Sequence, residues 1–206
     1  MPHPQAGIIP APSPNALFLI LRALDSPTNG RAIAKVMAGV PALVEKVGAV
    51  DPRAKLVCTV GFGSTFWDTI APTKRPSGLR PFKAIEGGPL RAPNTGGDVL
   101  LHILSKRHDL NFELAMRIRA QLGTMVEVMD EVHGFQYLDS RDLTGFIDGT
   151  ENPSGAKDRT QVALIGDEDK AFASGSYVFT QRYVHNLKKW ATIPTTEQEK
   201  AIGRKK

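Results

Sequence analysis

An aspartate between two glycines is the feature of this sequence best suited to chemistry. Asp148 lies in the run Gly145-Phe-Ile-Asp-Gly149, and Thr150-Glu-Asn-Pro153 follows directly. Glycine tolerates positive φ and permits close approach of the backbone to a flat ligand, and proline restricts the path of the chain after the loop. Such a loop can fix a carboxylate where it accepts and returns a proton. Asp-Gly is also common in ordinary turns, so this short run alone leaves both interpretations open.

A longer stretch around this aspartate resembles a family signature. Residues 139–153 read Asp139-Ser-Arg-Asp-Leu-Thr-Gly-Phe-Ile-Asp-Gly-Thr-Glu-Asn-Pro153, which is similar to the distal haem-pocket signature of the dye-decolourising peroxidases. The resemblance continues upstream through 92–103 and downstream through 175–190 and 197–204, in the order found in that family. It therefore covers most of the chain.

The resemblance implies an enzyme that binds haem b, reduces hydrogen peroxide and oxidises a bulky organic reductant such as a phenol or a dye. Asp148 would be the distal acid–base residue. Glu151 and Asn152, which come next after Thr150, could equally well form a hydrogen-bonded turn. The residues expected to line the cofactor pocket are Gly145, Gly149, Thr150, Glu151 and Asn152.

The family's proximal histidine and distal arginine come later in the chain than any segment matched here. We therefore expect this sequence to stop before both groups, with the iron ligand beyond Lys206, and the chain alone to be inactive. An alternative from another class is a non-enzymatic haem-binding or haem-handling protein that releases iron. A purely structural α+β domain is a third possibility.

The histidines show no metal-site spacing such as His-Glu-x-x-His. We expect each to be structural, although His185 is the nearest to the expected pocket along the chain. The others are His3, His102, His108 and His133.

Composition indicates a globular protein without a nucleic-acid or membrane partner. The 206 residues are 41% hydrophobic and 23% charged, and the net charge of +5 is scattered until a basic cluster at the C-terminus. No apolar run approaches the roughly 18 residues of a membrane span, and the start lacks the order of a secretion signal, so we expect a cytoplasmic protein. The single cysteine, Cys58, excludes an internal disulfide and is expected to be a buried strand thiol.

The elements that must position Asp148 follow the order β-α-β-β-α-β, which is that of a ferredoxin-like unit. Apolar runs predict the strands, three- and four-residue spacings predict the helices, and Pro41 predicts a break in the first helix. The resemblance implies a dimeric α+β barrel. The expected strands are 16–21, 55–62, 99–104 and 126–138, and the expected helices begin at Ser26 and cover 109–122.

Two units are expected, residues 1–135 as the first and 136–206 as the distal loop and an incomplete second. The second would start with a strand at 175–184, followed by helices at 187–190 and 195–202. Unpaired strand edges and an exposed apolar face favour a homo-oligomer.

The segment 63–98 is expected to be a long loop. Its residues Phe66 and Trp67 could pin this loop to the core or relay electrons.

Overall fold

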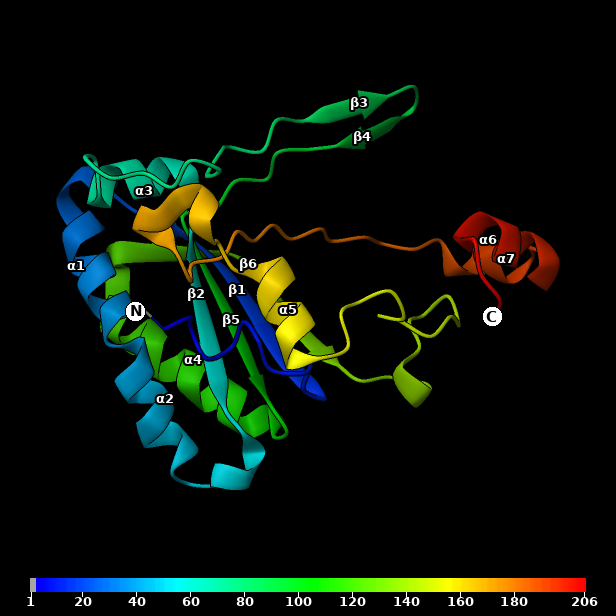
Figure 1. The fold of residues 1–206 in the computed structure, drawn as a ribbon, viewed down its shortest axis with the longest axis horizontal. Helices are drawn as coiled ribbons and strands as arrows, with labels where there is room; N and C mark the ends of the chain where they lie inside the picture. The colour runs from blue at the N-terminus through cyan, green and yellow to red at the C-terminus, as the bar shows by residue number, and fades with distance from the viewer. Residues whose placement is uncertain (1–2) are drawn as a thin grey trace.

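The computed structural model describes residues 3–206 and contains a four-stranded antiparallel sheet (Figure 1). The strand order β2-β5-β1-β6 and the helices between the strands are those of a ferredoxin-like unit, so the predicted α+β class is confirmed. The strands are β1 (Asn15–Ala23), β2 (Val57–Phe62), β5 (Val99–Ser105) and β6 (Val126–Phe135).

Three helices cover one face of this sheet: α1 (Ser26–Ala38), α2 (Val40–Gly48) and α4 (His108–Leu122) (Figure 1). The predicted break at Pro41 is confirmed, because the first helix ends at Ala38 and the proline lies in the first turn of α2, where no hydrogen bond is lost. Alternate strand residues point into the core beneath the helices. These include Leu17, Leu19, Leu21, Val99, Leu101 and Ile103.

On the second face of the sheet, the N-terminal chain contacts β2 through Gln5 and Val60, and α5 (Ala156–Ala163) lines a pocket together with Ala16 of β1 and Gly134 of β6. The predicted strand at 175–184 is wrong, because this segment is extended but pairs with no strand. It crosses the sheet instead of running along an edge. Val178 lies against Gly61 on β2, and Arg182 forms an ion pair with Asp130 on β6. Most of the segment is exposed, with Phe179 76% and Val184 93% exposed, and these two side-chain contacts hold it against the sheet in place of strand pairing.

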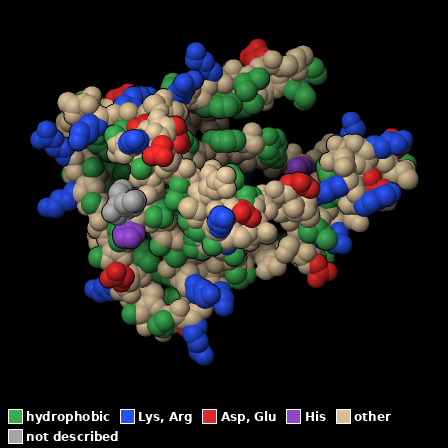
Figure 2. All heavy atoms as spheres, in the orientation of Figure 1, with side chains coloured by type: hydrophobic (Ala, Val, Ile, Leu, Met, Phe, Trp, Pro, Cys, Tyr) green, Lys and Arg blue, Asp and Glu red, His purple; other side chains and the backbone are tan. Residues whose placement is uncertain are grey.

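The predicted long loop at 63–98 contains more structure than expected. It begins with α3 (Ser64–Ile70) and then forms a hairpin of β3 (Ile85–Gly87) and β4 (Leu90–Ala92) that projects from the body. Figure 2 shows hydrophobic side chains along this projection, and its Leu90 is 75% exposed.

The aromatic pair in this segment packs inward. Phe66 is buried. Trp67 packs against Phe62 and Phe172 and donates Nε1–H to the Lys74 carbonyl over 2.8 Å. These contacts support a structural role for Phe66 and Trp67, in which they hold the loop against the core.

Cys58 is a free, buried thiol, and burial raises its pKa to about 12. In residues 3–206 no helix has the length and apolarity needed to cross a bilayer.

Asn111, on α4, is a polar residue inside the core. Its side chain is fully buried, and neither Oδ1 nor Nδ2 has a hydrogen-bond partner among the described residues. An unpaired buried amide costs about 1–3 kcal/mol, and leucine fills a similar volume without polar atoms. We expect Asn111→Leu to raise the free energy of unfolding in urea by about 1 kcal/mol. Asn111→Asp, the isosteric control, should lower it, and a loss of stability in Asn111→Leu would contradict the argument.

Candidate functional site

The stretch predicted to carry chemistry forms a small closed loop after β6. It starts with a 3-10 turn, η3 (Leu138–Ser140), in which Asp139 and Ser140 have φ values of 52° and 63°. A β-bridge joins Arg141 to Ile147, and the Asp148 amide donates to the Ser140 carbonyl over 2.7 Å. Asp148 is therefore fixed at the base of the loop, against the residues where the loop begins.

Glycine is required on both sides of this aspartate. Gly145 has φ 93° and Gly149 has φ 72°, in the left-handed region that side chains disfavour. A Cβ at Gly149 would also lie 3.1 Å from Asn152 Nδ2. The Gly149 amide donates to Asp148 Oδ1 over 2.8 Å, and the Asn152 amide donates to the Gly149 carbonyl over 3.1 Å. The loop therefore orients the carboxylate through its own backbone.

A second acid, Asp142, holds the far end of the loop. Its Oδ1 accepts the Thr144 amide over 2.8 Å and also the Thr144 hydroxyl. Burial acts to raise the pKa of Asp142, but the hydrogen bonds from Thr144, the Phe146 backbone and the charge of nearby His185 outweigh it and lower the pKa. The ionised form is thus the one that the folded loop favours.

This lowered pKa predicts a pH-dependent contribution to stability. The contribution is present above the ordinary value of 3.8 and is lost as pH falls through the lower folded value. We expect the urea midpoint of the wild type to exceed that of Asp142→Asn at about pH 6, and the gap to narrow as the pH falls below 3.8. Glu151→Gln, an exposed acid of the same loop, is the control. A gap that does not change with pH would contradict the assignment.

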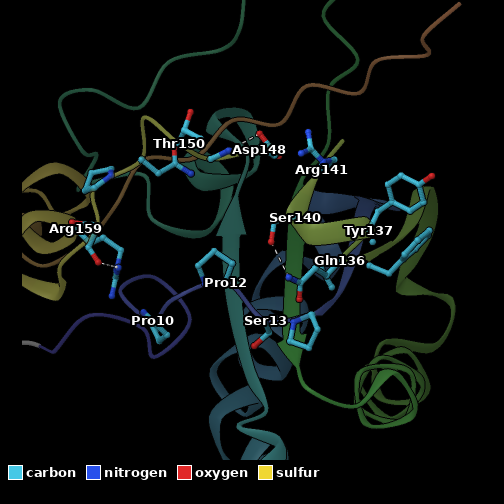
Figure 3. Close-up of a pocket in the computed structure, with 18 of the residues that line it drawn as sticks. Pro10, Pro12, Ser13, Gln136, Tyr137, Ser140, Arg141, Asp148, Thr150 and Arg159 are labelled. Atoms are coloured by element: carbon cyan, nitrogen blue, oxygen red, sulfur yellow. Dashed lines mark hydrogen bonds between the residues drawn. The ribbon is translucent and has the colours of Figure 1, made fainter. Parts of the chain in front are cut away.

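The loop forms one wall of a pocket of about 910 Å³, within the usual range for ligand sites. Figure 3 shows the N-terminal segment with Pro10 and Pro12 facing the loop across this space, and Arg159 of α5 at one side. Asp148 is the one carboxylate among the described lining residues. The pocket therefore combines apolar walls with a single acid held by its backbone.

The structure brings only part of the predicted set to the pocket. Gly149, Thr150 and Asn152 line it with Asp148. Gly145 and Glu151 do not. Gly145 turns the chain at the far end of the loop, where a Cβ would lie 2.5 Å from Lys206 Cε, and Glu151 is exposed.

Sequence reasoning missed two cationic residues in the lining, Arg141 and Arg159. Arg159 donates Nε–H to the Ile9 carbonyl and Nη1–H to the Ser154 carbonyl, both over 2.7 Å. It thereby ties the N-terminal segment to the end of the loop. The partners Ile9 and Arg159 are 150 positions apart, and no local pattern signals such a contact.

No histidine is among the described residues that line this pocket, and His102 lines a smaller adjoining pocket of about 320 Å³. His102 stacks on Phe18 at 4.4 Å between ring centroids, and burial lowers its pKa. The ring centroids of His108 and His133 lie 5.0 Å apart, and the His185 ring stacks on Tyr183. Across residues 3–206, no group of three or more His, Cys, Asp or Glu side chains is arranged to hold a metal ion. The pocket can accept a flat apolar ligand beside an acid, but the described chain provides no imidazole there.

Two family models match the chain. One, described as Dyp-type peroxidase, N-terminal, covers residues 5–136, and the other, Dyp-type peroxidase, C-terminal, covers residues 139–206.

Curated proteins and solved structures agree with the family models. The chain is 42% identical over 203 residues to the Dye-decolorizing peroxidase of Mycobacterium tuberculosis, covering 98% of this chain and 59% of that protein. It is similar to DyPB from Rhodococcus jostii, with TM-score 0.94 and 44% identity, over 100% of this chain and 66% of that one. A variant of the Rhodococcus jostii protein in complex with heme gives TM-score 0.94 and 46% identity over 98% of this chain and 65% of that one. The chain thus spans about three fifths to two thirds of these proteins.

Proposed function

Because this chain belongs to the dye-decolourising peroxidase family, we propose that it forms the distal part of a haem-dependent peroxidase that reduces hydrogen peroxide and oxidises bulky phenolic or dye-like compounds. The observation that carries this proposal is the placement of Asp148. A loop with two positive-φ glycines holds this carboxylate at the wall of a pocket that has no other acid among its described lining residues.

Asp148 acts as the acid–base residue in this proposal. Its Oδ1 accepts the Gly149 amide, while Oδ2 makes no hydrogen bond within the described chain and remains available for a proton. A carboxylate so placed takes the proton from one peroxide oxygen and returns it to the other as the O–O bond breaks. Bound haem would supply the redox chemistry of the iron.

The pocket residues fit haem on one side only. Pro10, Pro12 and Phe135 offer apolar contacts to a flat ring, and Arg141 and Arg159 carry charge suited to its carboxylates. Gly149, Thr150 and Asn152 would contact the ring beside Asp148. The described lining contains no imidazole to ligate the iron.

The domain organisation, oligomeric state and location of the chain are part of the same proposal. We propose residues 1–135 and 136–206 as separate units, which agrees with the change of family model between residues 136 and 139. A cytoplasmic homo-oligomer is proposed as well. Exposed apolar side chains such as Phe179 and Val184, 76% and 93% exposed, favour further association. A haem-handling role is not favoured, since the curated relative is named as a peroxidase.

The test is steady-state oxidation of a bulky dye by the haem-loaded protein at mildly acidic pH, with imidazole supplied if the iron lacks a nitrogen ligand. Turnover should require both hydrogen peroxide and haem. Iron release from haem without peroxide, and no dye oxidation, would support the haem-handling alternative and overturn the proposal.

A further inference from the structure

Side chains from outside the loop satisfy several of its carbonyl groups. Trp190 donates Nε1–H to the Thr144 carbonyl over 2.9 Å. Arg204 donates Nη2–H to the Ile147 carbonyl and Nη1–H to the Thr150 hydroxyl. The acceptors at 147 and 150 lie on either side of Asp148, so one guanidinium spans the peptide units that carry the proposed acid.

Trp190 lies in α6 (Leu187–Ala191), and Arg204 follows the end of α7 (Thr195–Ile202); the two helices lie beside the loop (Figure 1). Gln198, which is 4% exposed, joins the pair by donating Nε2–H to the carbonyls of Trp190 and Ile193, both over 2.9 Å. Gly203, with φ 84°, ends the second helix in the left-handed conformation and directs the next residue towards the loop. The two donors therefore belong to one connected element.

Packing reinforces the hydrogen bonds. Phe146 is fully buried, and its ring lies 6.4 Å from the Trp190 ring. The loop residue before Ile147 is thus anchored by apolar contact as well, which fixes the chain just ahead of Asp148.

We propose that Trp190 and Arg204 are positioning residues that hold Asp148 for proton transfer, and that α6 and α7 form the element that sets the loop conformation. The inference rests on the proposed function for its chemical consequence. Arginine suits this task because its planar fork reaches two separated acceptors at once, whereas the three donors of a lysine ammonium share one compact nitrogen. A small displacement of an acid–base group is enough to slow proton transfer.

Hydrogen exchange of the purified chain tests the positioning without haem. We expect peptides covering 144–152 to exchange about tenfold faster in Arg204→Met and in Trp190→Phe, which keeps an aromatic ring but removes the N–H donor. Arg204→Lys should fall between Arg204→Met and wild type. The matched controls are Arg117→Met, which loses a surface pair with Glu113, and Trp67→Phe, whose indole donates to a carbonyl away from this loop. Both controls should exchange like wild type over 144–152.

The chemical readout is kcat/KM for hydrogen peroxide in the haem-loaded protein. It should fall about tenfold in Arg204→Met and recover in part in Arg204→Lys, while KM for the dye stays unchanged. Loop exchange equal to wild type in both test variants would overturn the inference, and so would faster exchange with an unaltered peroxide rate. If wild type shows no peroxide-dependent oxidation while exchange responds as expected, the peroxidase proposal fails. The inference that Trp190 and Arg204 hold the loop conformation then stands.

Discussion

Asp148→Asn is expected to lower kcat/KM for hydrogen peroxide by about 10²–10⁴-fold, the usual contribution of a positioned acid–base group. Asparagine has the same shape and can still accept the Gly149 amide, so the loop should keep its conformation. It cannot take up a proton, however, and proton transfer between the two peroxide oxygens would lose its carrier. Stopped-flow or steady-state measurement of the peroxide step at mildly acidic pH gives the ratio directly.

Two other acids of the same loop serve as controls for this substitution. Asp139→Asn replaces a residue with φ 52°, a conformation that asparagine also tolerates, and Glu151→Gln replaces an exposed acid. Neither residue lines the pocket. Both variants should remain within about threefold of wild type, the change expected where no positioned proton carrier is removed. Equal losses in all three variants would assign the effect to loop charge or stability. Retained activity in Asp148→Asn would remove the aspartate from the mechanism.

The first unit could be predicted because its signals are local. Alternation of buried residues in β1 and the three- and four-residue spacing in α4 follow from which face of each element meets the core. The segment 175–184 was also predicted as a strand, and the prediction is wrong because a strand also needs a partner edge. Here the segment crosses the sheet between Gly61 and Asp130, and a sequence pattern does not encode that path.

The candidate site also contains some residues that the local sequence predicts and others that it does not. Asp148 and its glycines are adjacent in sequence, so the local pattern indicates their shared loop, and the family resemblance over 139–153 indicates its role. The residues that build the pocket around them, such as Arg159, act through contacts between distant segments. Trp190 in α6 and Arg204 just after α7 likewise contact the loop only in the folded chain. Local spacing carries no information on such pairs, and only the tertiary structure identifies them.

Titration of this 206-residue chain with ferric haem is expected to give no absorption spectrum of histidine-ligated iron. The reason is geometric, because none of the described lining residues of the pocket is a histidine. His102 is held against Phe18, and His185 lies with Tyr183 beside Asp142, outside the lining. Added imidazole should supply the missing nitrogen and produce the ligated spectrum.

Histidine variants distinguish a chain that provides no iron ligand from one in which His185 ligates the iron. His185→Ala and His102→Ala should give the same spectra as wild type, with and without added imidazole, because neither side chain lines the pocket beside Asp148, and His102, at the adjoining pocket, is stacked on Phe18. Suppose instead that the wild type shows a histidine-ligated spectrum without imidazole and His185→Ala loses it. The segment 175–186 would then have to move to bring His185 to the iron, since in this structure it crosses the sheet and is held at Asp130 by Arg182. Breaking that ion pair with Arg182→Met would then strengthen haem ligation, whereas the present geometry predicts no change.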